Sequence, residues 1–309
     1  MGHLLLGFSC RTLGVVPFTP VDISLMKLPF SEVFGSDLLA AEVVMLPGVT
    51  TYVGADITAG MYAYDIASSE RISFLIDLGT NGEMALGNKD KLLVTSTAAG
   101  PAFEGGNITW GCGSIRGAIC AAEIKNEKAQ VKTIGDGPPV GICGTGVVEI
   151  TDALLREELL DETGVLDDDY FDDGFPVAET AGGETIVFTQ KDVREVQLAK
   201  AAVRAGLETL LLRYGITYDD VAHVYLAGGF GYRMDKKKAV GIGLLPAALE
   251  DRIEAVGNSS LRGVIRYLAD PEGDDAVTGI AAKAEEVSLS ADKAFNEFYM
   301  DAMMFEEDS

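Results

Sequence analysis

The sequence predicts an α/β fold in which strands and helices alternate within one large domain or two subdomains. Short β-branched and aliphatic runs end in glycine-rich turns, and longer segments with apolar residues at helical spacing follow them. Hydrophobic residues make up 48% of the 309 residues, which is enough to bury a large core and argues against a disordered chain.

The elements follow in a regular order along the chain, and each is expected from its local pattern. Thr189 with Asp192 three residues later resembles a capping box, which marks the start of the longest helix. Strands are predicted over Ala40 to Leu46, Ile72 to Ile76, Met84 to Leu86, Lys91 to Ser96 and Val224 to Ala227, and helices over Gly54 to Ala67, Val147 to Leu160 and Thr189 to Tyr214.

Charge and cysteine content exclude several classes of function. The 48 acidic against 24 basic residues give a net charge of −24, so we expect neither nucleic acid nor an anionic membrane as a partner. The four cysteines show no CxxC pair, which argues against a disulfide framework or a zinc site. No run reaches the roughly 20 apolar residues of a membrane span, and a cytoplasmic location is expected.

The segment Asp77-Leu78-Gly79-Thr80-Asn81-Gly82-Glu83 follows an apolar strand and is suited to holding a polyphosphate. The two glycines let backbone N–H groups approach an anion, and the threonine and asparagine add side-chain donors. Asp77 can hold Mg²⁺ through a water molecule. An ordinary Asn-Gly hairpin turn is the alternative interpretation of this segment, and the residues alone leave it open.

A second glycine cluster, Gly228-Gly229-Phe230-Gly231, follows the apolar strand that ends at Ala227. Backbone without side chains offers a surface for a base and ribose, whereas a tight strand-to-helix connection is the alternative. Gly144-Thr145-Gly146 opens a helix, and its glycines suit either anion binding or close packing.

Five segments in this order resemble the C-terminal domain of the reductive activators of corrinoid proteins. They are DLGTNGE, AAGPAFEGGNI (98–108), GICGTG (141–146), TQKDVREVQLAKAAVRAG (189–206) and VYLAGGFG (224–231). The resemblance extends from about His3 to Phe305. It implies an α/β fold of the actin, Hsp70 and sugar-kinase type (the ASKHA fold), with two RNase H-like subdomains around an ATP cleft.

The resemblance also implies roles for individual residues. The catalytic residue would be Asp77, which would also position Mg²⁺ through water. Helix 190–213 would flank the base, although a solvated face is the alternative for its charged residues. The nucleotide-binding residues would be Gly79, Thr80, Asn81, Gly82, Glu83, Gly144, Thr145, Gly146, Glu195, Lys200, Gly228, Gly229 and Phe230.

Members of that family are longer and begin with a ferredoxin-like domain and an earlier phosphate hairpin. We therefore expect residues 1–68 to be the C-terminal part of an incomplete first RNase H-like subdomain. The second would span 69–285, and a helix in 286–309 would pack back on it. Because two hairpins clamp the polyphosphate in this fold, the chain by itself is expected to bind and hydrolyse ATP weakly.

The family's iron-sulfur cluster is not expected in this chain, so electrons would come from a ferredoxin-like domain or subunit. Cys143 lies where related dehydratase activators carry a cysteine, and two copies of the chain could share a cluster across a homodimer. A buried packing cysteine is the alternative.

The function that the resemblance implies is an ATPase that assists electron transfer to the corrinoid cofactor of a methyltransferase partner. A non-catalytic scaffold or regulatory subunit and a small-molecule kinase are the alternatives, since a shared fold does not decide function.

Overall fold

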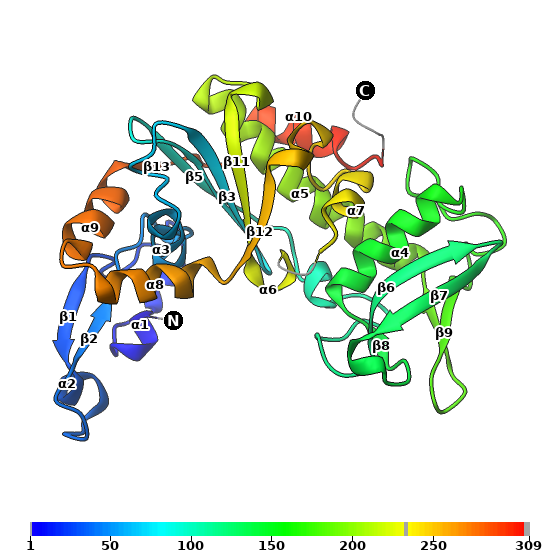
Figure 1. The fold of residues 1–309 in the computed structure, drawn as a ribbon, viewed down its shortest axis with the longest axis horizontal. Coiled ribbons are helices and arrows are strands. Elements are labelled where there is room, and N and C mark those ends of the chain that lie inside the picture. The colour runs from blue at the N-terminus through cyan, green and yellow to red at the C-terminus, as the bar shows by residue number, and fades with distance from the viewer. Residues whose placement is uncertain (1, 232–233, 306–309) are drawn as a thin grey trace.

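The computed structural model describes residues 2–231 and 234–305, which form a large and a small lobe (Figure 1). A six-stranded sheet with the order β12-β11-β3-β4-β5-β13 forms the large lobe, and a three-stranded sheet, β7-β6-β8, forms the small one. The large sheet comprises β3 (Ile72–Leu78), β4 (Gly82–Gly87), β5 (Leu92–Thr97), β11 (Val221–Ala227), β12 (Ile253–Gly257) and β13 (Ala284–Glu286). The small sheet comprises β6 (Ala118–Lys125), β7 (Lys128–Thr133) and β8 (Gly141–Ile142).

The large sheet is mixed. The strands β3, β4 and β5 form an antiparallel meander, whereas β11 runs parallel to both β3 and β12. In the register of β11 and β3, Ala227 lies beside Asp77. Because parallel strands end at the same edge of a sheet, the two glycine-rich segments begin side by side.

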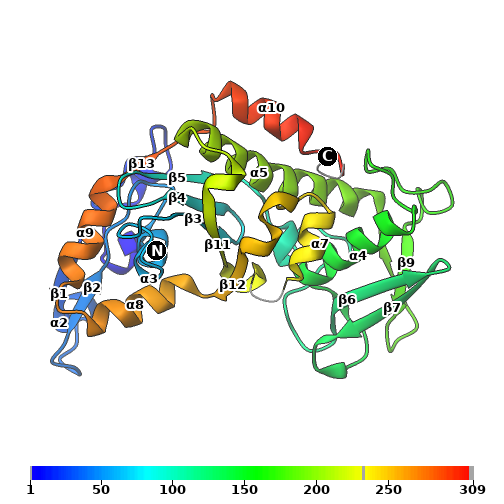
Figure 2. The same cartoon turned by 45° about the horizontal axis from the view of Figure 1, so that its top comes forward.

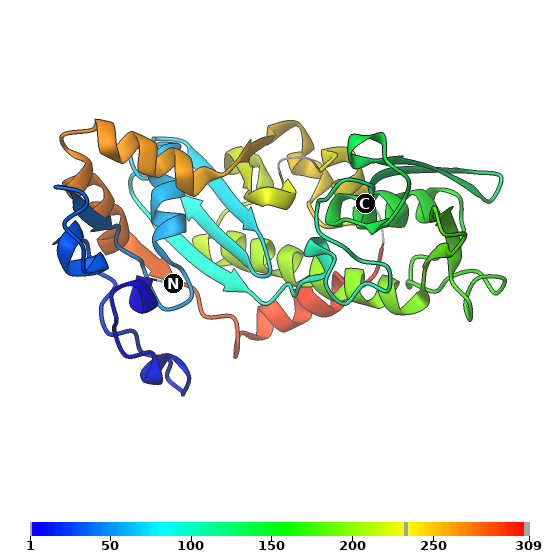
Figure 3. The same ribbon diagram turned by 90° about the horizontal axis from the view of Figure 1, so that it is seen from below.

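Alternating residues of β3 divide the core into two parts. Phe74, Ile76 and Leu78 pack in the cluster that includes α5 (Gln190–Tyr214), and Leu75 packs in the cluster that includes α3 (Ala55–Ala63). The helices α8 (Ser259–Ala269) and α9 (Gly273–Lys283) pack against α3. Figure 2 shows α5 and α10 (Lys293–Asp301) on one side of the sheet and α3 and α8 on the other, and Figure 3 shows the same arrangement from below.

The helix α5 begins at the predicted capping box. The Thr189 amide donates to Asp192 Oδ2 (2.9 Å), and the Asp192 amide donates to Thr189 Oγ1 (3.3 Å). Gly215, with a φ of 87°, ends the helix in the left-handed conformation that glycine adopts most readily. The helix α10 then packs along α5.

In the small lobe, α4 (Gly144–Arg156) packs on β6, and β9 (Phe175–Glu179), which pairs with β10 (Thr185–Phe188), packs on β7. The first residues form α1 (Gly2–Leu5), α2 (Phe30–Phe34) and the pair β1 (Met26–Pro29) and β2 (Glu42–Met45). Two short helices, α6 (Gly228–Gly231) and α7 (Lys236–Gly241), follow β11.

The predicted elements are all present, with changed ends. The helix α3 ends at Ala63, four residues before the predicted end, and α4 begins at Gly144 instead of Val147 because the glycines themselves form its first turn. None of the helices in the described residues is both long and apolar enough to cross a lipid bilayer.

Candidate functional site

One cavity of about 750 Å³ lies where the segments after β3 and β11 meet the start of α4. We call it the central cavity. Its walls come from both lobes, and they include Asp77, Leu78, Gly79, Phe103, Glu104, Cys112, Gly113, Ser114, Cys120, Ile134, Gly144, Thr145, Gly228 and Gly229. Seven residues from three separate sequence motifs therefore line a single space that can hold a nucleotide-sized ligand.

The close approach of the two strand ends requires glycine at position 228. Gly228 has a φ of +95°, and a Cβ added there would lie 2.4 Å from the Leu78 carbonyl oxygen and 2.9 Å from Asp77 Oδ1. Gly229 is exposed, and a Cβ there would meet nothing within 4 Å. Gly228 thus brings the loops together, and Gly229 leaves the cavity wall open.

The turn between β3 and β4 is not an ordinary Asn-Gly hairpin turn. A type I′ turn needs positive φ at both central residues, and neither Asn81 nor Gly82 has one. Gly82 is already paired with Leu78 and buried, and a Cβ there would lie 2.7 Å from Thr97 Oγ1. Gly82 therefore serves close packing, whereas Gly79 faces the cavity.

Thr80, at the tip of this turn, contacts a residue that the sequence did not single out. Its hydroxyl donates to Glu104 Oε2 at 2.6 Å, and both side chains are exposed. Glu104 lines the central cavity. An incoming phosphate would compete with this carboxylate for the Thr80 hydroxyl.

In the segment Gly144-Thr145-Gly146 at the start of α4, the first two residues suit anion binding and the third suits close packing. Gly144 and Thr145 line the cavity at the N-terminus of a 13-residue helix, where unpaired amides and the helix dipole favour an anion. Gly146 packs on β6, since a Cβ there would lie 2.2 Å from the Ile119 carbonyl oxygen.

Three carboxylates gather at the carboxyl end of β3. Burial raises the pKa of Asp77 to about 6, and the nearby charge of Asp56 adds to this effect. Burial also raises the pKa of Glu83, with a further contribution from Asp56. Asp56, in the first turn of α3, therefore belongs to the site; its segment, residues 54–60, is the nearest candidate in the sequence for the missing phosphate loop but was interpreted as a helix start.

Asn81 and Glu83 lie on the side of the β3–β4 hairpin that faces away from the central cavity. Together with Asp56 they line a second cavity of about 720 Å³, beside β5 and the segment after β13. The β3–β4 hairpin therefore separates two cavities, and only its Asp77 to Gly79 side faces the central one.

The structure does not bring Lys200 to the central cavity, which corrects the expectation that it contacts nucleotide. Lys200 is 1% exposed, and its ammonium donates to the carbonyl oxygens of Ala302 (2.7 Å) and Met304 (2.5 Å). Glu195 is half-buried on α5 and accepts from Asn107 Nδ2 at 3.2 Å, and neither residue is among those that line the cavity. The side chain of Phe230 lies outside the described part of the structure.

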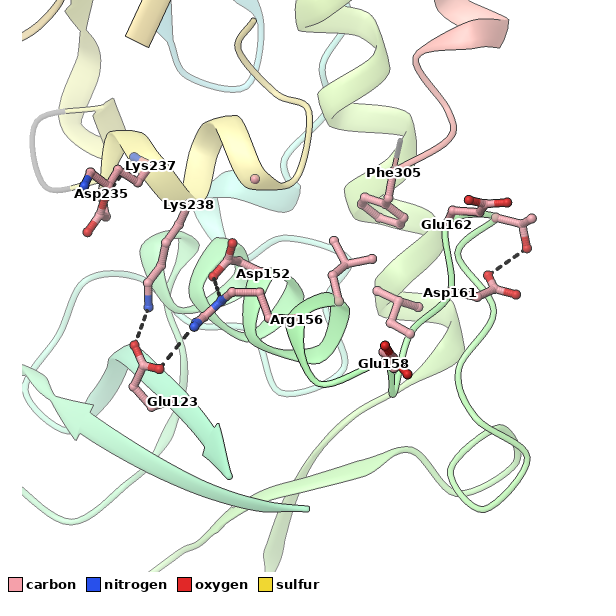
Figure 4. A pocket seen from close by; sticks show the side chains of 14 residues that line it. Glu123, Asp152, Arg156, Glu158, Asp161, Glu162, Asp235, Lys237, Lys238 and Phe305 are labelled. Atoms are coloured by element: carbon pink, nitrogen blue, oxygen red, sulfur yellow. Dashed lines mark hydrogen bonds and ion pairs between the residues drawn. The ribbon is translucent and has the colours of Figure 1, made fainter. Parts of the chain in front are cut away.

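A third cavity, of about 820 Å³, lies between α4, α7 and Phe305 (Figure 4). Two basic side chains in its wall form ion pairs: Lys238 bonds to Glu123 and to Glu149 outside the wall, and Arg156 bonds to Asp152 and Glu123. None of the predicted site residues lines this cavity.

No three His, Cys, Asp or Glu side chains in residues 2–231 and 234–305 are grouped closely enough to hold a metal ion by themselves. Cys143 is buried at the start of α4, and its Sγ lies 3.2 Å from the Ile119 carbonyl oxygen and 3.1 Å from Thr145 Oγ1. This environment agrees with the packing interpretation of that cysteine.

Comparison with known proteins gives the chain a family. The family model for the C-terminal domain of RACo, described as the ASKHA domain, matches residues 71–309, and the model for the RACo middle region matches residues 1–69. The corrinoid activation enzyme RamQ of Eubacterium limosum is 35% identical over 324 residues, which cover 99% of this chain and 54% of that protein.

Two further matches agree. A [Co(II) methylated amine-specific corrinoid protein] reductase of Methanosarcina barkeri is 30% identical over 297 residues, covering 88% of this chain and 53% of that protein. A solved reductive activator for corrinoid, iron-sulfur protein superposes with a TM-score of 0.88 at 35% identity, over 98% of this chain and 51% of that one. The chain spans about half the length of these relatives.

These matches confirm the expected α/β fold of the actin, Hsp70 and sugar-kinase type. The chain belongs to the RACo family of reductive activators of corrinoid proteins, and residues 71–309 are its ASKHA domain.

Proposed function

We propose that this chain binds MgATP in the central cavity and acts within a reductive activator that assists electron transfer to the corrinoid cofactor of a methyltransferase partner. The observation that carries the proposal is the single cavity shared by the segments after β3 and β11 and the start of α4. Relatives named as corrinoid activation enzyme and as corrinoid protein reductase support the redox role.

The nucleotide would lie with its phosphates between the Asp77 to Thr80 turn and the N-terminus of α4. Gly144 and Thr145 would offer backbone amides to the phosphates, Gly79 would leave room for them, and the Thr80 hydroxyl would leave Glu104 to join them. Gly228 and Gly229 would lie against the ribose and base.

The residues present fit a magnesium ion held through water. Within the described residues, Asp77 has no ion pair with a basic side chain, and its raised pKa shows that burial and Asp56 oppose its charge. A divalent cation would relieve that repulsion, and when bound it would neutralise charge on the phosphates. Asp77 would orient the water shared with the cation.

We assign ATP hydrolysis and electron transfer to the assembled activator, because the chain spans about half of its relatives. A ferredoxin-like domain or subunit would supply electrons, and a corrinoid protein would receive them. We also propose that the chain forms a homodimer, that it acts in the cytoplasm, and that its subdomains divide at residues 68 and 285. The iron-sulfur cluster of the activator would lie outside this chain.

Titration calorimetry with MgATP, MgADP and AMP tests the proposal. We expect the wild-type chain to bind MgADP and MgATP weakly but measurably, and Gly228→Ala to lose binding because its Cβ would clash with Leu78 and Asp77. Gly215→Ala is the matched control: it strains a similar backbone angle (φ +87°) with no neighbour within 4 Å. If the wild-type chain binds no nucleotide, the scaffold alternative replaces this proposal.

A further inference from the structure

Cys112 and Cys120 line the central cavity and Cys143 lies behind its wall, and the proposed function uses none of these cysteines. Cys112 lines the cavity and is partly exposed, and Cys143 is buried beneath it at the N-cap of α4. Both are free thiols.

Backbone pairing sets these two cysteines side by side. Gly111 and Ile142 form a parallel bridge, in which the Ile142 amide donates to the Trp110 carbonyl (2.8 Å) and the Cys112 amide donates to the Ile142 carbonyl (2.9 Å). One residue further along, Cys112 lies next to Cys143. Neighbouring strands lie about 4.8 Å apart, and disulfides join Cα atoms about 4.4 to 6.8 Å apart, so this register is within bonding range.

The side chains also share one face. A Cβ added to Gly141 would lie 2.9 Å from Cys112 Sγ, so the Cys112 thiol occupies the space that this glycine leaves free. In extended backbone, residues two apart point to the same side, which directs Cys143 to the face of Gly141 where Cys112 lies. The charge of Cys143 also contributes, after burial, to a raised pKa of Cys112, which places the two sulfurs within electrostatic reach.

We propose that Cys112 and Cys143 form a dithiol that a low-molecular-weight disulfide oxidises reversibly to an intramolecular disulfide. Cys112, the exposed partner, first attacks the small disulfide, which forms a mixed disulfide and releases one small thiol. Cys143, once deprotonated, then attacks Cys112 Sγ and breaks its bond to the second small thiol. Two thiol protons and two electrons pass from the protein to the small disulfide.

The new bond would join residues 110–112 to the first turn of α4, whose Gly144 and Thr145 line the cavity. We infer that this bond fixes the wall beside the start of α4 and thereby weakens nucleotide binding in the cavity. This consequence rests on the proposed function, whereas the dithiol itself does not.

The experiment treats the reduced chain with glutathione disulfide under native conditions and maps the products by non-reducing digestion and mass spectrometry. We expect a cross-linked Cys112–Cys143 peptide and its loss on adding dithiothreitol. Cys143→Ser, which keeps an N-cap side chain, should stop the reaction at a stable mixed disulfide on Cys112. Cys120→Ser, a cysteine of the same cavity, should leave the cross-link unchanged.

Calorimetry then separates the two claims, with the reduced protein as reference. Oxidation should weaken MgADP binding at least about tenfold, and reduction should restore it. A Cys112 that remains a thiol, a mixed disulfide that persists in the wild-type chain, or pairing with Cys120 would overturn the dithiol. A cross-link that leaves affinity unchanged would overturn only the effect of oxidation on nucleotide binding.

Discussion

The carboxylate of Asp77 is half-buried beside that of Asp56, and its pKa is raised to about 6. The folded protein therefore favours the protonated acid, and the cost of ionising it appears as pH rises from about 4 to 6. At neutral pH Asp77 is ionised at this cost in free energy. A cation that binds beside Asp77 compensates the unfavourable negative charge, so the folded protein binds the cation more tightly.

Asp77→Asn should raise the free energy of unfolding by about 1 to 3 kcal/mol at pH 7.5, with no gain below about pH 4, because it removes the disfavoured charge. It should also abolish stabilisation by Mg²⁺ with nucleotide, which in the wild-type chain should grow as pH rises through about 6. Thermal unfolding between pH 4 and 8 measures both effects. Equal pH dependence in wild type and variant would show that Asp77 is not the responsible group.

Glu104 presents a second test at the scale of one residue. Its carboxylate lines the central cavity and accepts the Thr80 hydroxyl, so it opposes an anionic ligand. Glu104→Ala should strengthen binding of ADP without Mg²⁺ by roughly two- to fivefold through loss of like-charge repulsion. Glu184→Ala, an exposed carboxylate outside that cavity, is the control for net charge. Weaker binding by Glu104→Ala would instead assign Glu104 to holding the ligand.

At the scale of elements, one buried side chain, Asp192, both caps the start of α5 and binds the loop that contains Thr109. Asp192 is fully buried and accepts from the Thr189 amide, the Thr109 amide (2.7 Å) and the Thr109 hydroxyl (2.9 Å). Asp192→Ala leaves these donors without a partner and should destabilise the chain by about 2 to 4 kcal/mol. Asp220→Ala, in the exposed capping box at Thr217, should cost less than about 1 kcal/mol, and urea unfolding measures the difference.

The capping box of α5 shows which elements were predictable. Local patterns determine it, so Thr189 and Asp192 were identified from the sequence alone, as were the strands that end at the glycine segments. The bond from Thr109 to Asp192 joins residues far apart in the chain, and no local pattern contains it. Gly146 and Gly82 were predicted to contact the ligand. In the sequence, a glycine that allows close packing cannot be distinguished from a glycine that contacts a ligand.

At the scale of the whole molecule, the buried Lys200 of α5 binds the C-terminal segment 302–305. Lys200 Nζ donates to the carbonyls of Ala302 and Met304, and the Phe305 amide donates to the Glu162 carbonyl at 2.8 Å. Lys200→Met should destabilise the chain by about 2 to 4 kcal/mol and speed hydrogen exchange in residues 302–305, because it leaves these carbonyls unpaired. Lys191→Met, exposed on the same helix, should change neither quantity.

Lys200 also shows which part of the site could not be predicted from the sequence. Helical spacing places a lysine on a face of α5, but only the packed fold decides whether that face meets ligand or another segment. Asp56 was missed for the same reason, because α3 and β3 meet across the core. The glycine turns were found because their chemistry is contained in a few consecutive residues.

The parallel pairing of β11 with β3 has a consequence for biosynthesis. These neighbours are separated in the chain by the whole small lobe and by α5, so the ribosome must release all of that sequence before the pair can form. Contacts of this range form slowly. A nascent chain that ends before β11 leaves one edge of β3 unpaired, and ATP, which would need both strand ends, could favour the native form only after synthesis has passed Gly229.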